Sequence, residues 1–330
     1  APPAPATGRR ALPQAPRQAL FDLQAERERQ QQDLDALQHL AARLPDATAR
    51  RAQVAVLRAR LDTELGRYAS ARVHAQDALA LLDGDAGGAS PALPVEARLQ
   101  LAQVMLLSGA ASAARPLLDS ALALAREQGI VAARATALSG IAHLHWQLGD
   151  YAACEQGLTE ALQQARQGSP WRVQLNLLND LGAVAQARSR LGDAARRYEE
   201  ATQIARRIGD RSGEAMLLNN LGSASLVGGH FDRARQHAEQ AARLFAETGE
   251  TVLHAQALAN TAEASRELGQ LGPARAMSEQ ALALLQAGGS RPGVALVLEN
   301  LGLIEGAAGR PDAGLARLHD AVAVAREIGS

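Results

Sequence analysis

The polar residues that most need an explanation are asparagines that recur at a fixed step of 40 residues. Asn220, Asn260 and Asn300 follow this step, and Asp180 stands in the same column. Asparagine costs roughly half a kcal/mol relative to alanine inside a helix, so its recurrence in a helical pattern requires a reason. Its amide can donate and accept a hydrogen bond at the same time. Two explanations remain open: the asparagines bind a ligand, or they join neighbouring helices and stabilise the stack.

Other chemistry has little support in the sequence. All 34 basic residues are arginine, so a Walker-type phosphate lysine, a Schiff base and a Ser-Lys dyad are excluded. The eight histidines are scattered without an HExxH pattern, and Cys154 is the single cysteine. A disulfide framework, CxxC redox chemistry and thiolate zinc clusters are therefore excluded. We expect no enzyme activity, no metal and no cofactor.

Composition favours a helical protein that does not bind nucleic acid or a membrane. Hydrophobic residues make up 47% of the 330 residues but aromatic residues only 2%, so the core is built from Leu, Ala, Val and Ile. Such a core suits close helix-on-helix packing better than a β-sandwich. The net charge of −1 gives no steering toward anionic partners. No apolar run is long enough to span a bilayer, and we expect a cytoplasmic location.

Four further columns repeat at the same step and indicate stacked helical hairpins. A glycine in the left-handed conformation ends a helix cheaply, so one glycine column predicts the end of each hairpin and the other the tight turn within it. The alanine column predicts a close helix–helix contact, and the leucine column a buried face. The four columns are Gly129, Ser169 (after Gly168), Gly209, Gly249, Gly289 and Gly329; Gly109, Gly149, Ser189, Gly229, Gly269 and Gly309; Ala121, Ala161, Ala201, Ala241, Ala281 and Ala321; and Leu138, Leu178, Leu218, Leu258 and Leu298.

The segment LLNNLGSASLVGGHFDRARQHAEQA, residues 217–241, resembles a tetratricopeptide repeat. The Leu221–Gly222 pair, Gly229, Phe231, Ala234 and Ala241 stand at the spacing of that motif. The 40-residue period resembles the longer variant of kinesin light chains, cell-polarity adaptors and the sensor regions of maltose-regulator-type activators. The resemblance implies an all-α, right-handed superhelical solenoid of helix-turn-helix repeats.

The expected domain organisation has three parts. Residues 1–16 are predicted to be a disordered Pro/Ala-rich lead-in, and residues 17–45 an N-terminal capping or linking helix. Seven repeats of the tetratricopeptide type are expected over residues 46–330, the first of them offset by 43 residues rather than 40 because of a longer loop. The helix at 17–45 either caps the array or is the remnant of a further domain.

The resemblance also implies a function. In that family the first helix of each repeat lines a concave groove, and asparagines there hold extended peptides by their backbone. The chain is therefore expected to be a non-enzymatic scaffold or sensor that binds a peptide or protein segment, as part of a bacterial regulatory protein. The alternative is a small-molecule, sugar-type sensor of a transcriptional regulator. The residues expected to face this groove are Trp146, Asn176, Asn179, Asp180, Asn219, Asn220, Gln256, Asn260, Glu263 and Asn300.

Overall fold

The computed structural model describes residues 32, 35–36, 47–83 and 89–329 of the chain. The predicted lead-in and most of the predicted capping helix lie outside these residues. In the part that is described, the chain forms fourteen helices and no strand. The all-α fold predicted from the repeat pattern is confirmed. The helices are α2 (Ala47–Glu64), α3 (Tyr68–Asp83), α4 (Ala92–Leu107), α5 (Ala111–Glu127), α6 (Val131–Gln147), α7 (Tyr151–Ala165), α8 (Trp171–Ala187), α9 (Leu191–Ile208), α10 (Arg211–Val227), α11 (Phe231–Thr248), α12 (Thr251–Glu267), α13 (Leu271–Ala287), α14 (Arg291–Ala307) and α15 (Pro311–Glu327).

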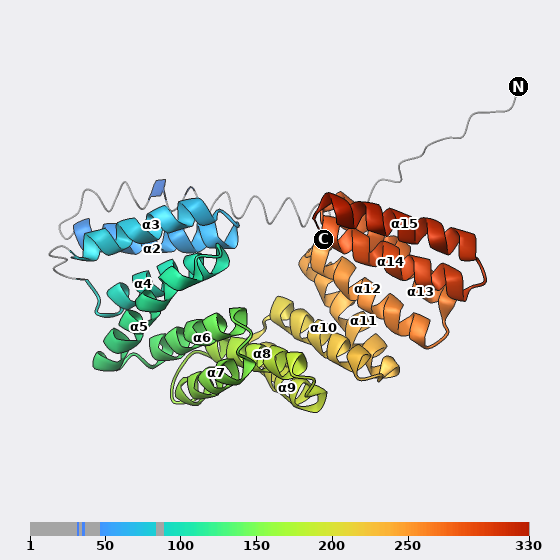
Figure 1. Cartoon of the computed structure of the whole chain (residues 1–330). Coiled ribbons are helices and arrows are strands. Elements are labelled where there is room, and N and C mark those ends of the chain that lie inside the picture. The colour runs from blue at the N-terminus through green and yellow to red at the C-terminus, as the bar shows by residue number, and fades with distance from the viewer. Residues whose placement is uncertain (1–31, 33–34, 37–46, 84–88, 330) are drawn as a thin grey trace, which may run out of the picture. The chain divides into compact units, whose positions relative to one another are not determined.

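The helices fall into two compact units, with the boundary between Ala234 and Arg235 in α11. In the N-terminal unit α2 pairs with α3, α4 with α5, α6 with α7, and α8 with α9, and α10 packs on α9. The first helices α2, α4, α6 and α8 also contact one another in succession. In Figure 1, α4 and α6 lie on the inner side of this unit and α5 and α7 on its outer side. In the C-terminal unit α12 pairs with α13 and α14 with α15.

The glycine columns end helices as the sequence predicts. Every glycine of the two columns has a positive φ, as has Gly168 at the position next to Ser169. Ser189 is the exception in its column and adopts the same left-handed conformation, with φ of 58°. Aspartates cap two of the helices: Asp150 accepts a hydrogen bond from Ala153 N, and Asp210 from Gly213 N, both at 3.0 Å. These caps satisfy backbone donors that a helix start leaves free.

The core consists of small and aliphatic side chains at repeating positions. The alanines of the predicted column, on the second helices, are fully buried from Ala121 to Ala281, and Ala321 is 8% exposed. The leucines of the predicted column are buried on the first helices. Alanine at the contact allows backbones to approach closely, and the second helices α3, α5, α7, α9 and α13 each pack against the first helix that follows.

Gly182 marks the tightest approach between α8 and α9. A Cβ built on this residue overlaps the ring of Tyr198, which is 2% exposed. We predict that Gly182→Ala lowers the free energy of unfolding by about 1–3 kcal/mol, because the buried ring has to move. The matched control is Gly192→Ala in α9, where the new Cβ meets no atom within 4 Å; this change should stabilise the helix by about 0.5–1 kcal/mol. Denaturant unfolding of both variants checks the prediction, and equal effects would contradict it.

A second prediction concerns the left-handed serine. Because a side chain is strained at positive φ, Ser189→Gly should raise the free energy of unfolding by about 0.5–1 kcal/mol. The reciprocal change, Gly229→Ser at φ of 71°, should lower it by a similar amount. Thermal melts of the two single variants measure both effects. If neither variant changed the melting temperature, the left-handed conformation of this turn would carry no strain for a serine side chain.

Candidate functional site

A groove of about 610 Å³ runs along the first helices of the N-terminal unit. Its lining follows the spacing i, i+3, i+4, i+7, which is one face of a helix. Successive helices contribute the same positions because the repeat is 40 residues long. The residues at these positions are Glu96, Leu99, Gln100 and Gln103 on α4; Thr136, Ser139, Gly140 and His143 on α6; and Asn176, Asn179 and Asp180 on α8.

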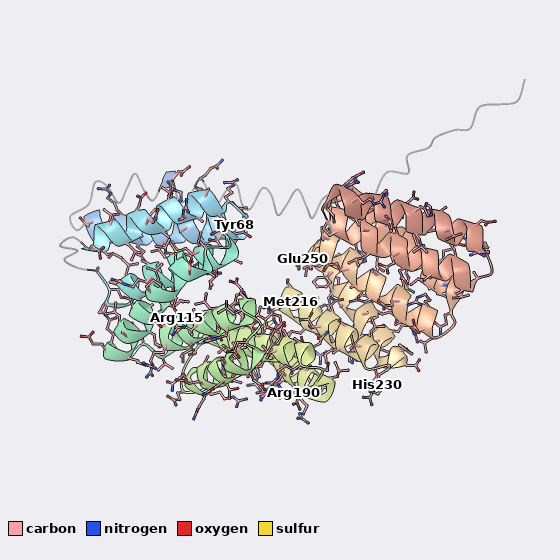
Figure 2. The ribbon with its side chains drawn as sticks, viewed as in Figure 1. Tyr68, Arg115, Arg190, Met216, His230 and Glu250 are labelled. Atoms are coloured by element: carbon pink, nitrogen blue, oxygen red, sulfur yellow. The ribbon has the colours of Figure 1, made fainter. Side chains whose placement is uncertain are left out.

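Three of the predicted site residues, Asn176, Asn179 and Asp180, lie in this groove. Gln103 and His143, whose side chains are exposed there, were not predicted. They stand 80 and 40 residues before Ala183 in the repeat, so the period itself could have identified them. Met216, on α10, stands 40 residues after Asn176. Figure 2 shows Met216 and Arg190 on opposite sides of the helices α8 to α10.

Asparagines link neighbouring first helices in the N-terminal unit. Asn220 Nδ2 donates to Asn179 Oδ1 across 2.9 Å, from α10 to α8. Asn179 Nδ2 in turn donates to Asp180 Oδ1 across 3.4 Å. The amide of Asn179 is thereby held at both ends, while each end keeps capacity for one further hydrogen bond. Such contacts are what the stacking explanation expects, and ligand binding by these asparagines stays a prediction.

Asn300 is held in a similar way within the C-terminal unit. Its Oδ1 accepts from Arg266 Nε at 3.1 Å, and its Nδ2 donates to Ser278 Oγ at 3.3 Å. These two contacts join α14 to α12 and α13. The remaining predicted residues are half-buried at Asn219 on α10 and Asn260 on α12, and exposed at Gln256 and Glu263 on α12.

Asp180 is the acidic member of the asparagine column and is half-buried. Desolvation raises the pKa of its carboxyl, against the opposing effects of His143 and of the hydrogen bond from Asn179. Burial, together with the Asp180 charge, raises the pKa of Tyr198 to about 12. A carboxylate in this position is therefore costly to keep ionised.

A smaller cavity of about 250 Å³, here called the side pocket, adjoins the groove. It shares Ser139, His143 and Asp180 with the groove, so these residues form the junction. Trp146 lies on its wall and meets Tyr151 edge to face, with ring centroids 5.1 Å apart. The other lining residues are Cys154, Leu158, Ala183 and Val184.

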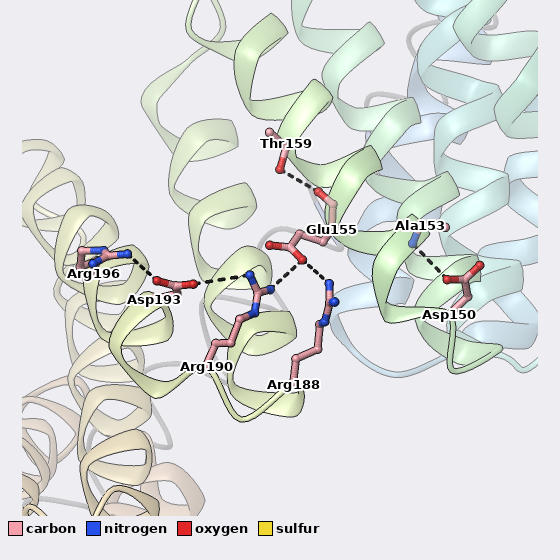
Figure 3. Close-up of polar contacts among 8 residues, drawn as sticks. All are labelled: Asp150, Ala153, Glu155, Thr159, Arg188, Arg190, Asp193 and Arg196. Atoms are coloured by element: carbon pink, nitrogen blue, oxygen red, sulfur yellow. Dashed lines mark hydrogen bonds and ion pairs between the residues drawn. The ribbon is translucent and has the colours of Figure 1, made fainter.

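An ion-pair network lies at the start of α9 and was not predicted (Figure 3). Glu155 Oε2 on α7 accepts from Arg188 and Arg190, at 2.5 and 2.6 Å, and Arg190 also pairs with Asp193, which pairs with Arg196. The hydrogen bond from Arg190 is the main cause that lowers the pKa of Glu155. Because the network ties α7 to the turn before α9, it fixes one hairpin on the next.

Among the described residues, no group of three or more His, Cys, Asp or Glu side chains is placed to hold a metal ion. None of the described helices is long and apolar enough to cross a membrane.

Residues 133–207, which contain most of α6 to α9, match the family model of the tetratricopeptide repeat. These residues are tetratricopeptide repeats. The tetratricopeptide resemblance is confirmed by this match, which lies before the segment 217–241 that suggested it. The matched residues include most of α6 and all of α8, which line the groove and the side pocket. A search of curated proteins finds no match.

Solved structures share the tetratricopeptide-type fold at low sequence identity. BtubC from P. vanneervenii is 23% identical with a TM-score of 0.58, over 69% of this chain and 92% of that one. A signal transduction ATPase with numerous domains and a tetratricopeptide repeat sensor, from Pyrococcus horikoshii, is 14% identical with a TM-score of 0.70, over 86% of this chain but only 43% of that protein. A Rap protein complexed with competence and sporulation factor is 13% identical with a TM-score of 0.64, over 89% of this chain and 80% of that one.

The raised pKa of Asp180 leads to a pH-dependent prediction. A carboxyl whose pKa is higher in the folded state stabilises the fold below its unfolded pKa, and this contribution is lost as the pH rises through the folded pKa. Above its raised pKa the ionised Asp180 is therefore a cost, and Asp180→Asn should raise the melting temperature there. The gain should shrink as the pH falls through the raised pKa, because the wild-type carboxyl then becomes neutral.

Asp77→Asn, at an exposed position on α3, is the matched control and reports the effect of the charge change itself. Melting temperatures of the three proteins between pH 4 and pH 8 make the comparison. A gain for Asp180→Asn that is independent of pH would contradict the assignment.

Proposed function

We propose that the groove of the N-terminal unit binds an extended peptide segment of a protein partner, and that the chain is the non-enzymatic binding module of a cytoplasmic regulatory or signalling protein. The main support is the groove itself, whose polar side chains stand at the same positions on successive helices. An extended peptide presents backbone N–H and C=O groups along its length. Gln103, Asn176 and Asn179 present amides that can donate and accept toward both.

Rigidity favours this role. The groove side chains project from packed helices rather than loops, so little ordering entropy is lost on binding. The hydrogen bond from Asn220 holds Asn179 in place and leaves each end of its amide capacity for a peptide group. In this proposal Asn179 is a positioned contact, and Asn220 is the residue that positions it.

The groove shows a balance of charge that suits a peptide better than a polyanion. Arg60 and His143 line it together with Glu96 and Asp180. The groove therefore lacks the uniformly positive potential that would favour nucleic acid or a phosphate-rich ligand.

Within the C-terminal unit, the first helices carry Gln256, Asn260, Glu263 and Asn300 at the equivalent positions of the repeat. We propose these residues as further contacts along the partner. Asn300 would contribute by the second lone pair of Oδ1 and the second hydrogen of Nδ2, because Arg266 and Ser278 use the others.

The regulatory role is supported by likeness alone. One similar structure is a Rap protein complexed with competence and sporulation factor, and another carries its tetratricopeptide repeats as the sensor of a signal transduction ATPase. These functions belong to the two similar proteins. For this chain, the similarity favours a module that senses or recruits a partner.

A small-molecule sensor is the second candidate, and one observation favours it. The side pocket is compact and has Trp146 on its wall, as a platform for a sugar ring requires. A sugar would occupy this pocket alone, whereas a peptide would follow the groove across several helices.

The test begins with a displayed library of random linear peptides selected on the whole chain. Gln103→Ala should weaken the selected peptides about 2- to 10-fold, because one or two hydrogen bonds to the peptide backbone are lost. Asn176→Ala should act similarly. Gln163→Ala is the matched control, since Gln163 is equally exposed but lies on the second helix α7.

Isothermal titration of each variant with the same peptide gives the comparison. Failure to select any peptide, or equal losses for Gln103→Ala and Gln163→Ala, would overturn the proposal. Binding of mono- or disaccharides in place of peptides would favour the second candidate.

A further inference from the structure

The side pocket has a polar mouth and an apolar end. Its mouth is formed by Ser139, His143 and Asp180, which it shares with the groove and which are half-buried or exposed. Its far wall consists of Cys154, Leu158 and Val184, each no more than 2% exposed. The polarity and the burial therefore change together along the pocket, from the groove inward.

The far wall has no group that could receive a charge. Burial raises the pKa of the Cys154 thiol to about 11, so this side chain is a neutral, apolar surface at physiological pH. A cationic head that lay against Leu158 and Val184 would be surrounded by apolar side chains, and Asp180 is the one acidic residue among those that line the pocket. Burying an unpaired charge in this way is strongly unfavourable.

The size of the pocket suits one large apolar side chain. An apolar cavity of about 150 Å³ holds a benzene-sized molecule, and this pocket measures about 250 Å³. Small side chains would leave most of it empty. Trp146 is held edge to face against Tyr151 and offers the rest of its ring to an aromatic neighbour.

The pocket exists because position 183 carries a small residue. The equivalent positions at the 40-residue step are Gln103, His143, Ser223, Glu263 and Leu303. Ala183 is the smallest of these side chains, and it lines the side pocket. Space that a longer side chain would fill is thereby open to a ligand.

We propose that the side pocket is the anchor site of the groove and takes a single aromatic side chain of the bound peptide. The proposal rests on the peptide function proposed above and names the residue class that confers specificity. The backbone of the anchor residue would lie at the mouth, where Asp180 can accept its N–H. One fully desolvated aromatic anchor commonly supplies a large share of the binding energy of such an interface.

Four small amides test the pocket without the peptide: N-acetyl-phenylalaninamide, and the leucine, alanine and lysine analogues. The readout is the fluorescence of Trp146 in the whole chain with Trp171→Phe, which removes the second tryptophan. The phenylalanine amide should saturate at a concentration about tenfold lower than the alanine and lysine amides, with the leucine amide between them. Tightest binding by the lysine amide would overturn the proposal.

Ala183→Leu fills the pocket and should weaken the phenylalanine amide about tenfold or more. Ala187→Leu is the matched control, because Ala187 lies one turn further along α8 and is exposed outside the pocket; binding should stay within about twofold of that of the starting chain. If Ala183→Leu does not unfold cooperatively, and so is not properly folded, Ala183→Val fills less of the pocket and takes its place in the test. An unchanged affinity in the filled variant would overturn the proposal.

The two proposals can fail separately. If selected peptides lose affinity with Gln103→Ala but not with the filled pocket, the groove function stands and the anchor pocket is refuted. If the phenylalanine amide binds and Ala183→Leu abolishes its binding while no peptide can be selected, the pocket stands and the peptide function is refuted.

Discussion

Close approach of helix backbones at small residues is the constraint on which the other features depend. Alanines that are fully buried on the second helices, and Gly182 against the Tyr198 ring, bring adjacent helices nearer than larger side chains would permit. With few aromatic residues in the chain, the core gains its burial from many such contacts rather than from a few large side chains. In the N-terminal unit the hairpins pack on one another in succession, so the first helices α2, α4, α6 and α8 lie side by side. This arrangement brings separate polar residues of α4, α6 and α8 together in the groove.

The repeat length then decides what this surface presents. A 40-residue step returns each first helix to the same rotation, so the positions of Asn176, Asn179 and Asp180 recur at the same height on every helix. The residue at the Asn176 position differs in every repeat, whereas the Asp180 column keeps asparagine at Asn220, Asn260 and Asn300, and the leucine and alanine columns do not change. The buried columns carry the fold and leave the exposed positions free to vary. A partner would be recognised by the order of these variable residues along the stack.

Much of the fold could be predicted from the sequence because its determinants are local and periodic. The positive φ at Gly109 and Gly129, the buried alanines and the alternation of helices all follow from columns that can be read along the chain. The site was predictable only in part. Asn176, Asn179 and Asp180 were identified by residue type, but Gln103 and His143 belong to the groove through their register alone. The side pocket depends on Ala183, because this small side chain leaves space that a longer one would fill. Its walls come from α6, α7 and α8, and no local sequence pattern describes how these three helices pack.

Asn179 joins these two levels, because its amide lines the groove and also accepts a hydrogen bond from Asn220 on the neighbouring first helix. Asn220 donates one hydrogen bond to Asn179. The Asn300 amide is bonded at both ends, because it accepts from Arg266 and donates to Ser278. An amide fixed in this way is a better ligand contact than a free one, since its rotamer entropy has already been lost on folding. Stacking and binding are therefore not exclusive explanations. Asp180 departs from the column by exchanging the amide for a carboxyl whose pKa is raised by desolvation, and it does so at the junction of the groove and the side pocket. Under the proposed function, the stability that the ionised Asp180 costs at this junction is offset by the contact that it makes with the bound partner.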